Sequence, residues 1–281
     1  MTVKDLLGKY QYGMRALGSV AGTYHTNTLE GYERWKAAGI KFWETDVAIS
    51  SDDKYVMIGH FLDEVTMRRM EIDNLPDELT YDWYMHQKLF PKSTKGLTPL
   101  SLEQMIGFAR QETDSVYMLD MYPFSLGDSY HKTKHFLTYL DNCIGEDKSL
   151  YDRIIVEAYN KGMIDAISEF PQIKYRQMSV STFMKNENIS DIHQVVKYAK
   201  ENNISVISYE WRYAKKHIDH LEVLKDSGFV FISRSVTNLF SNAKKKKYGV
   251  NIALLDYYFT KPTDTFAMMR LFFSRIQQKH G

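Results

Sequence analysis

The sequence contains little cysteine and almost no net charge. Cys143 is the single cysteine in 281 residues, so no disulfide can form within the chain, and we expect a reducing, cytoplasmic location. The chain has 36 Lys and Arg against 35 Asp and Glu, a formal net charge of +1. No overall field favours nucleic acid, so we expect no nucleic-acid partner. The basic run Lys244–Lys247 is interpreted as a helix end or a solvated loop.

Long apolar runs are also missing. No stretch approaches the roughly 18 consecutive apolar residues that a membrane-spanning helix needs. The opening stretch, MTVKDLLGKYQYGMRALG, lacks the apolar core of a secretory signal peptide. We therefore expect a soluble protein without a transmembrane segment. What the chain does contain is 44% hydrophobic residues, enough at this length to bury a large core.

Short β-rich runs alternate with helical periods along the chain. We expect strands near residues 16–20, 40–49, 55–60, 116–122, 154–158, 177–182, 206–211, 229–233 and 250–256. Between two of them, Ser101 and Gln104 have the spacing of a helix capping box. About eight strand–helix units predict a parallel sheet closed into a (β/α)8 TIM barrel, in a single domain over residues 1–281.

Two segments stand outside this alternation. Residues 61–98 contain two prolines, several acids and aromatic side chains, and we expect an inserted lobe over one end of the barrel. The lobe side chains expected to shape the choice of substrate are Tyr81, Trp83, Tyr84 and His86. The amphipathic stretch at residues 266–276 could pack on its own barrel or on a second copy, so a homo-oligomer is left open.

Two carboxylates stand on one face of the strand expected at residues 40–49. Because side chains alternate across a strand, Glu44 and Asp46 point the same way, about 7 Å apart. Burying like charges together is costly, so a metal ion, an Arg or a Lys should lie between them. Hard oxygen ligands favour Mg²⁺ or Ca²⁺. The alternative is a strand end where both acids lie in water.

A further acid, Asp120, interrupts the apolar run SVYMLDMYPF. Functional groups of a barrel gather at the C-terminal ends of its strands, so Asp120 can converge there with Glu44 and Asp46. His60 ends the run YVMIGH and would lie beside them. Taken alone, His60 could instead be a structural histidine of the core or rim.

In their order and spacing, these motifs resemble the glycerophosphodiester phosphodiesterases, which are phosphatidylinositol-phospholipase-like barrels. The resemblance runs through HTNTLEGYERWKAAGIKFWETDVAISSDDKYVMIGHF, TPLSLEQMI, MLDMY and GVNIALLD, over about residues 14–257. It implies that one divalent cation, Mg²⁺ or Ca²⁺, is bound by Glu44, Asp46 and Asp120. It also implies that His60 is the general acid for the leaving alcohol, and that the substrate is a small phosphodiester. Asn27, Tyr122 and Trp211 are predicted to bind this substrate.

The chain departs from the family pattern at several positions: Phe61 replaces the Asp after the second histidine, Tyr122 replaces the Lys after the third acid, and the first histidine is missing. The family's first histidine follows the first strand, but the matching stretch here, GMRALGSVAG, has Arg15, and no histidine precedes His25. Arginine stays protonated, so Arg15 cannot act as a base, but it can clamp the phosphate bidentately. The candidates for a replacement base are His25, Tyr122 or a metal-bound hydroxide.

Three functions are compatible with a site in which His60 is kept and the first catalytic histidine is replaced by Arg15. The first is a metal-dependent phosphoric diester hydrolase acting on a glycerophosphodiester-like substrate, for example in lipid metabolism. The second is a catalytically impaired barrel that binds a phosphorylated ligand, since losing an acid–base group typically lowers the rate by about 10²–10⁴. The third is a phosphoryl or glycosyl-phosphate transferase in polysaccharide or metabolite synthesis.

Overall fold

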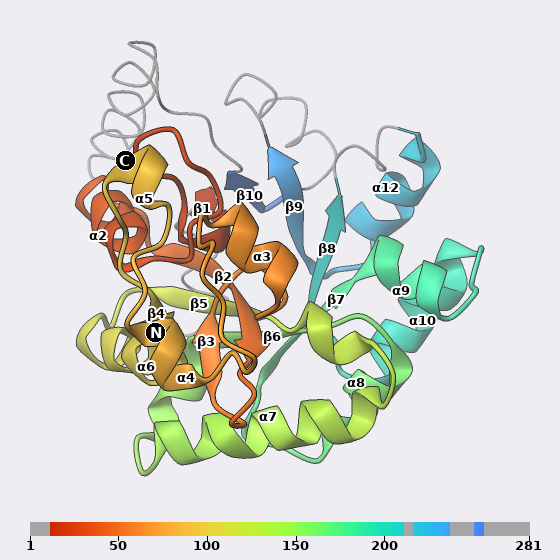
Figure 1. Ribbon diagram of the computed structural model, residues 1–281. Helices are drawn as coiled ribbons and strands as arrows, with labels where there is room; N and C mark the ends of the chain where they lie inside the picture. Colours follow the sequence, from red (N-terminus) through yellow and green to blue (C-terminus); the bar gives the residue numbers. More distant parts are fainter. Residues whose placement is uncertain (1–11, 211–215, 237–249, 256–281) are drawn as a thin grey trace.

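The computed structural model describes residues 12–210, 216–236 and 250–255 (Figure 1). Three sequence predictions therefore concern positions outside the described residues: Trp211, the run Lys244–Lys247 and the amphipathic stretch at residues 266–276. Among the described helices, none has the length and apolar character needed to cross a bilayer.

Eight parallel strands form the central sheet. They are β1 (Tyr12–Met14), β2 (Phe42–Ile49), β5 (Val116–Asp120), β6 (Ile154–Ala158), β7 (Tyr175–Ser179), β8 (Val206–Glu210), β9 (Val230–Val236) and β10 (Ile252–Leu255). Their order is β1-β10-β9-β8-β7-β6-β5-β2, and β1 returns to β2 through one residue pair, Met14 with Trp43. The predicted (β/α)8 architecture is confirmed, although β1 and β2 are paired through only that one described residue pair.

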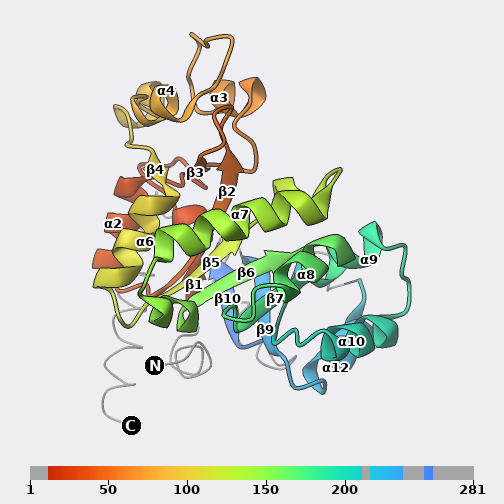
Figure 2. The same cartoon turned by 90° about the horizontal axis from the view of Figure 1, so that it is seen from below.

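Helices cover the outside of this sheet (Figures 1 and 2). The longer ones are α2 (Leu29–Ala37), α6 (Leu102–Gln111), α7 (Ser129–Ile144), α8 (Lys161–Ser168), α9 (Val180–Asn186), α10 (Ile192–Glu201) and α12 (Ile218–Lys225). Short 3₁₀ turns lie at η1 (Arg15–Leu17), η2 (Tyr122–Ser125) and η3 (Lys148–Asp152). The capping box predicted from Ser101 and Gln104 begins α6.

The predicted lobe lies between β2 and α6, and Figure 2 shows it standing away from the barrel helices. It contains α3 (Glu64–Arg69), α4 (Tyr81–Met85) and α5 (Pro91–Thr94), next to the short antiparallel strands β3 (Tyr55–Met57) and β4 (Leu100–Ser101). Buried side chains from Ala48 to Leu97 form its own apolar core, which includes Tyr84. The lobe is thus a small packed unit attached to the end of β2.

The barrel interior changes from apolar to polar along its strands. Its apolar layer is made by Phe42, Val116, Met118, Ile155, Val206, Ile232, Ile252 and Leu254. Gly13 on β1 lets the chain approach this layer, because an added Cβ would lie 2.4 Å from the Phe42 ring. Further along the strands the buried side chains include Glu44, Asp120 and Glu157. The apolar layer therefore closes the barrel below a polar site at the C-terminal strand ends.

The first strand was predicted in the wrong place. The apolar run at residues 16–20 suggested a strand, but β1 is Tyr12–Met14 and the chain then turns. Ala16 and Leu17 have positive φ angles of 47° and 53°, outside the extended region. This turn directs the Ala16 N–H to the side chain of Glu44 at 2.6 Å, which a continuing strand could not do.

Candidate active site

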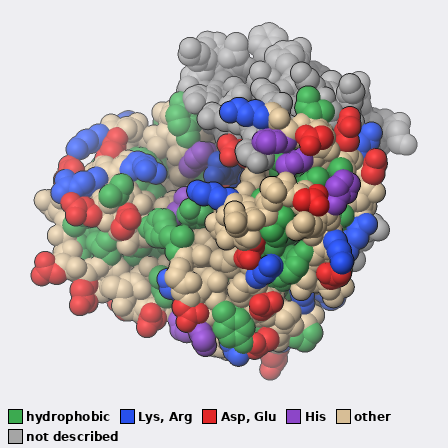
Figure 3. Space-filling view, turned by 90° about the vertical axis from the view of Figure 1, so that its right-hand side faces the viewer, with side chains coloured by type: hydrophobic (Ala, Val, Ile, Leu, Met, Phe, Trp, Pro, Cys, Tyr) green, Lys and Arg blue, Asp and Glu red, His purple; other side chains and the backbone are tan. Residues whose placement is uncertain are grey.

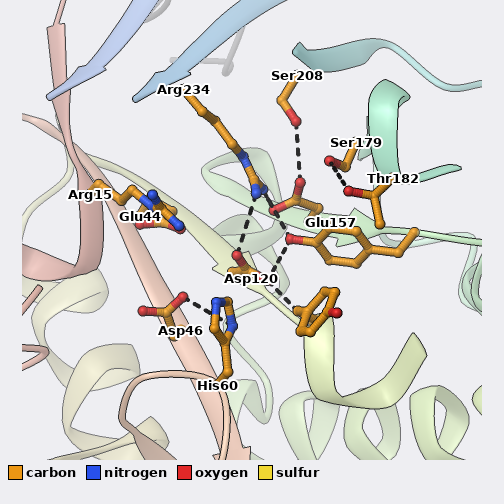
Figure 4. A network of polar contacts seen from close by, with 12 residues as sticks. Arg15, Glu44, Asp46, His60, Asp120, Glu157, Ser179, Thr182, Ser208 and Arg234 are labelled. Carbon is orange, nitrogen blue, oxygen red and sulfur yellow. Dashed lines mark hydrogen bonds and ion pairs between the residues drawn. The ribbon is translucent and has the colours of Figure 1, made fainter. Parts of the chain in front are cut away.

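The three predicted acids lie together inside the barrel, at the ends of neighbouring strands (Figure 4). Glu44 and Asp46 are on β2 and Asp120 is on β5, where Asp46 and Asp120 are paired in register. Glu44 and Asp120 are 0% exposed and Asp46 is 4% exposed. The alternative of two acids lying in water at a strand end therefore does not describe this structure.

Each acid is held through one carboxylate oxygen. Glu44 Oε2 accepts the Ala16 N–H at 2.6 Å, and Asp46 Oδ2 accepts from Asn27 Nδ2 at 2.9 Å. Asp120 Oδ1 accepts from the Tyr122 N–H at 2.9 Å and from the Tyr159 hydroxyl at 2.6 Å. Asn27 and Tyr122 thus contact the acids of the site, through the Asn27 side chain and the Tyr122 backbone. That they also bind the substrate stays a prediction.

The second oxygen of each acid has no hydrogen-bond donor among the described residues. These atoms are Glu44 Oε1, Asp46 Oδ1 and Asp120 Oδ2, all buried. Buried oxygens normally have partners, so three such atoms in one place fit a cation-binding site. The described side-chain nitrogens near these oxygens lie beyond hydrogen-bond distance: Arg15 Nε is 3.9 Å from Glu44 Oε1, His60 Nδ1 is 3.6 Å from Asp46 Oδ1, and Arg234 Nη1 is 3.7 Å from Asp120 Oδ2.

Neighbouring charges make the buried acids differ in their pKa. Burial, reinforced by the charge of Asp46, raises the pKa of Glu44 to about 8 against the opposing effect of Arg15. Burial would also raise the pKa of Asp120, but Arg234 and His60 outweigh it and hold that pKa below the usual value. Asp120 is therefore ionised at neutral pH, whereas Glu44 titrates close to it.

His60 lies at the edge of this acid cluster. Its ring is 5.0 Å from the ring of Tyr122, and its backbone has a positive φ of 56°. The ligand atoms of Asp46, His60 and Asp120 lie within 4.8 Å of one another. Two sets of side chains could thus hold a cation: the three acids, or Asp46 and Asp120 together with His60.

Two further charged residues of the site were not predicted from the sequence. Arg234 on β9 forms an ion pair with Glu157 on β6, and its Nη1 is 3.7 Å from Asp120 Oδ2. Its Nη2 also donates to the hydroxyl of Tyr159 at 3.1 Å, and Ser208 donates to Glu157 at 3.2 Å. The signal was present in the sequence, because Glu157 interrupts IIVEA and Arg234 interrupts FISRS as Asp120 interrupts its own strand.

The charges of the centre add up to an excess of negative charge. Glu44, Asp46, Asp120 and Glu157 carry four negative charges when ionised, and Arg15 and Arg234 carry two positive ones. The difference of two is the charge that one divalent cation would neutralise. Burial first, and then the charge of Asp46, raises the pKa of Glu44 in this cluster.

A pocket of about 460 Å³ opens beside the acids, and its lining includes Arg15, His25, Asp46 and His60. Its wall opposite the barrel is formed by the lobe. The lining does not include the four lobe side chains predicted to shape substrate choice, Tyr81, Trp83, Tyr84 and His86. Tyr84 is buried in the lobe core, and its hydroxyl donates to the Met57 carbonyl at 3.0 Å.

Charged side chains elsewhere on the molecule are of mixed sign. Figure 3 shows the face that carries α9, α10 and α12, where basic and acidic side chains are interspersed among the described residues. A basic stripe of the kind that tracks a nucleic-acid backbone is not present in that view of the described part.

Compared by sequence, the chain matches no protein-family model and no curated protein. Compared by structure, it is similar to a glycerophosphodiester phosphodiesterase from Parabacteroides distasonis, with a TM-score of 0.65 and 15% identity over 95% of this chain and 98% of that one. The chain has the glycerophosphodiester phosphodiesterase fold. A phosphodiesterase from Oleispira antarctica, in complex with the product sn-glycerol-3-phosphate, matches with a TM-score of 0.66 and 13% identity over 94% and 99% of the two chains. The enzyme from Thermotoga maritima matches at 0.58 and 17%, over 92% and 96%. The fold that the sequence motifs implied is thereby confirmed.

Proposed function

We propose that the protein is a metal-dependent phosphoric diester hydrolase acting on a glycerophosphodiester-like substrate. The observation that carries this proposal is the set of three buried carboxylate oxygens that accept no hydrogen bond from the described residues, beside a pocket that Arg15 and His60 line. The donor set is made of hard oxygens, which suits Mg²⁺ or Ca²⁺ on Glu44, Asp46 and Asp120. Such a cation would neutralise phosphate charge and polarise the phosphoryl group.

Arg15 is assigned to hold the phosphate. Its side chain is 20% exposed and lines the pocket, while Glu44 behind it is fully buried. A guanidinium can donate two parallel hydrogen bonds to two phosphate oxygens, which fixes the orientation of the diester. This assignment gives a function to the residue that stands where the family has its first histidine.

His60 is assigned to protonate the leaving alcohol. Its Nδ1 lies 3.6 Å from Asp46 Oδ1, so Nε2 is the ring nitrogen that we assign to the substrate oxygen. His25 lines the same pocket and is assigned to take a proton from the attacking water. One P–O bond forms to that water and one breaks to the alcohol, so a phosphomonoester and a free alcohol result.

Activity of substituted enzymes tests these assignments. We expect release of phosphomonoester from glycerophosphodiesters to fall by about 10²–10⁴ in His60→Ala and His25→Asn, the usual loss of an acid–base group. The exposed His131, which binds Asp128 at 2.8 Å outside the pocket, provides the control variant His131→Ala. Full activity of His60→Ala would overturn the assignment of the proton donor.

One observation favours a second candidate, a barrel that binds a phosphorylated ligand without turnover. Arg15 Nε lies 3.9 Å from Glu44 Oε1, so a fixed internal cation faces one of the proposed metal ligands. This candidate predicts binding of glycerol phosphate with no product from any diester, and restoration of a base by Arg15→His would then raise activity.

A further inference from the structure

The pocket beside Arg15 and His60 extends from the acids to the inserted lobe. Its lobe side is lined by Thr66, Arg69, Met70, Glu71, Phe90 and Ser93. These residues belong to α3, to α5 and to the turns that follow or precede them. A substrate whose phosphate lies at Arg15 therefore places one of its alcohol groups against the lobe.

The two ionisable lobe side chains of this pocket differ in what they already contact. The Glu71 carboxylate accepts the Lys92 N–H at 2.7 Å, the Ser93 N–H at 2.9 Å and the Ser93 hydroxyl. Arg69 is exposed and forms no ion pair with a carboxylate of the described residues. Among the described residues, the lobe side of the pocket thus presents one cation, Arg69, that no carboxylate pairs with.

The neighbouring charges show that Arg69 is a distinct case. Arg68, one residue earlier, pairs with Glu64 at 2.8 Å and is not part of the pocket lining. Asp73, the next acid along the chain after Glu71, pairs with Lys92 at 2.9 Å. A basic residue near the C-terminus of α3 is favourable in itself, but Arg68 already fulfils that role.

We propose that Arg69 binds a second anionic group, a phosphate monoester or a carboxylate, on the alcohol part of the substrate. The proposal rests on the proposed function only for the position of the reacting phosphate at Arg15. A guanidinium fits either anion bidentately. Met70 and Phe90 add apolar side chains to the lining of this pocket, and its volume of about 460 Å³ accommodates a small charged alcohol.

Calorimetric binding of matched ligands tests this assignment. The ligands are glycerophosphoglycerol, the same diester with a terminal phosphate monoester, and an analogue ending in a carboxylate. They are titrated into the full chain carrying His60→Ala, so that no turnover disturbs the heats. We expect the anionic ligands to bind about tenfold to a hundredfold more tightly than the neutral one, the range of a charge-assisted contact.

Adding Arg69→Gln should reduce this affinity ratio to about one, whereas Arg68→Gln, the adjacent control, should leave it intact. Arg69→Lys should keep part of the ratio because it keeps the charge. Equal affinity for neutral and anionic ligands, or a ratio that survives Arg69→Gln, overturns the proposal. The ratio is read from binding alone, so absence of hydrolysis would contradict the proposed function and not this inference.

A second experiment distinguishes a lipid head group from a soluble metabolite as the natural ligand. The same anionic head group is attached to diacylglycerol and incorporated into phosphatidylcholine vesicles. Vesicle flotation that depends on Arg69 indicates a lipid head group, and binding of the soluble diester alone indicates a free metabolite. Either result supports the anion site. If neither the vesicles nor the soluble diester binds, the proposal is overturned.

Discussion

Glu44 and Asp120 are equally buried, yet their neighbours give them opposite pKa shifts. Burial disfavours the charge of both side chains. Arg234 and His60 lie near Asp120 and lower its pKa, whereas Asp46 lies near Glu44 and raises its pKa to about 8. At the scale of single residues, charge in this site is set by the neighbours of each acid and not by burial alone.

The raised pKa of Glu44 predicts a pH dependence of stability. An unfolded Glu ionises near pH 4.5, so the folded protein retains a proton there up to about pH 8. The resulting stabilisation, on the order of a few kcal/mol, is complete at low pH and is lost as pH rises through 8. In EDTA, the free energy of unfolding should fall between pH 5 and 9, and this fall should be smaller in Glu44→Gln.

Urea unfolding at several pH values measures this effect. The exposed Glu33 provides the control, and Glu33→Gln should follow the wild-type curve. Saturating Mg²⁺ or Ca²⁺ should flatten the wild-type curve, because the cation favours ionised Glu44. A wild-type curve identical to that of Glu44→Gln would contradict the raised pKa.

The ligand set of the cation is also decided at the scale of residues. If three carboxylates bind it, Asp120→Asn should weaken Mg²⁺ binding by at least about tenfold, and His60→Gln should change it little. If His60 is a ligand, His60→Gln should weaken binding as much, and Zn²⁺ or Co²⁺ should displace Mg²⁺. Calorimetric titration of the metal-free protein with each cation distinguishes the two sets, and we expect the carboxylate set.

At the scale of elements, strand alternation made much of the site predictable. One strand placed Glu44 and Asp46 on the same face, and a charge inside an apolar run identified Asp120. The same rule applies to Glu157 and Arg234, but local pattern cannot tell which strands face each other across a closed barrel. Their pairing links β6 and β9, which are separated by two strands in the sheet order. The turn after β1 was missed because its hydrogen bond goes to Glu44, far along the chain.

The ion pair across the barrel predicts a large coupling energy. Removing one partner of a buried pair leaves an uncompensated charge, so Arg234→Met or Glu157→Gln should each cost about 3–5 kcal/mol of unfolding free energy. The double variant should cost less than the sum of the two. The pair Lys134–Glu169, with side chains 46% and 41% exposed, is the control and should show little coupling because solvent screens exposed charges. Additive effects in the urea double-mutant cycle of Arg234 and Glu157 would contradict the account.

At the scale of the whole molecule, the site is built from three layers with different roles. The apolar layer closes the barrel, the polar layer above it holds the acids and arginines, and the lobe forms the far wall of the pocket. The strands position the charged groups of the candidate site. The lobe has its own apolar core, so its pocket-facing side chains can be substituted without altering the strands.

The most direct test of the central claim is the initial rate of glycerophosphodiester hydrolysis at increasing Mg²⁺ or Ca²⁺, followed by phosphorus NMR in wild type and Glu44→Ala. We predict that phosphomonoester appears only with the cation, that EDTA stops its formation, and that the rate in Glu44→Ala is at least about a hundredfold lower. A wild-type rate that does not depend on the cation, or a Glu44→Ala rate equal to wild type, would contradict a metal-dependent hydrolase.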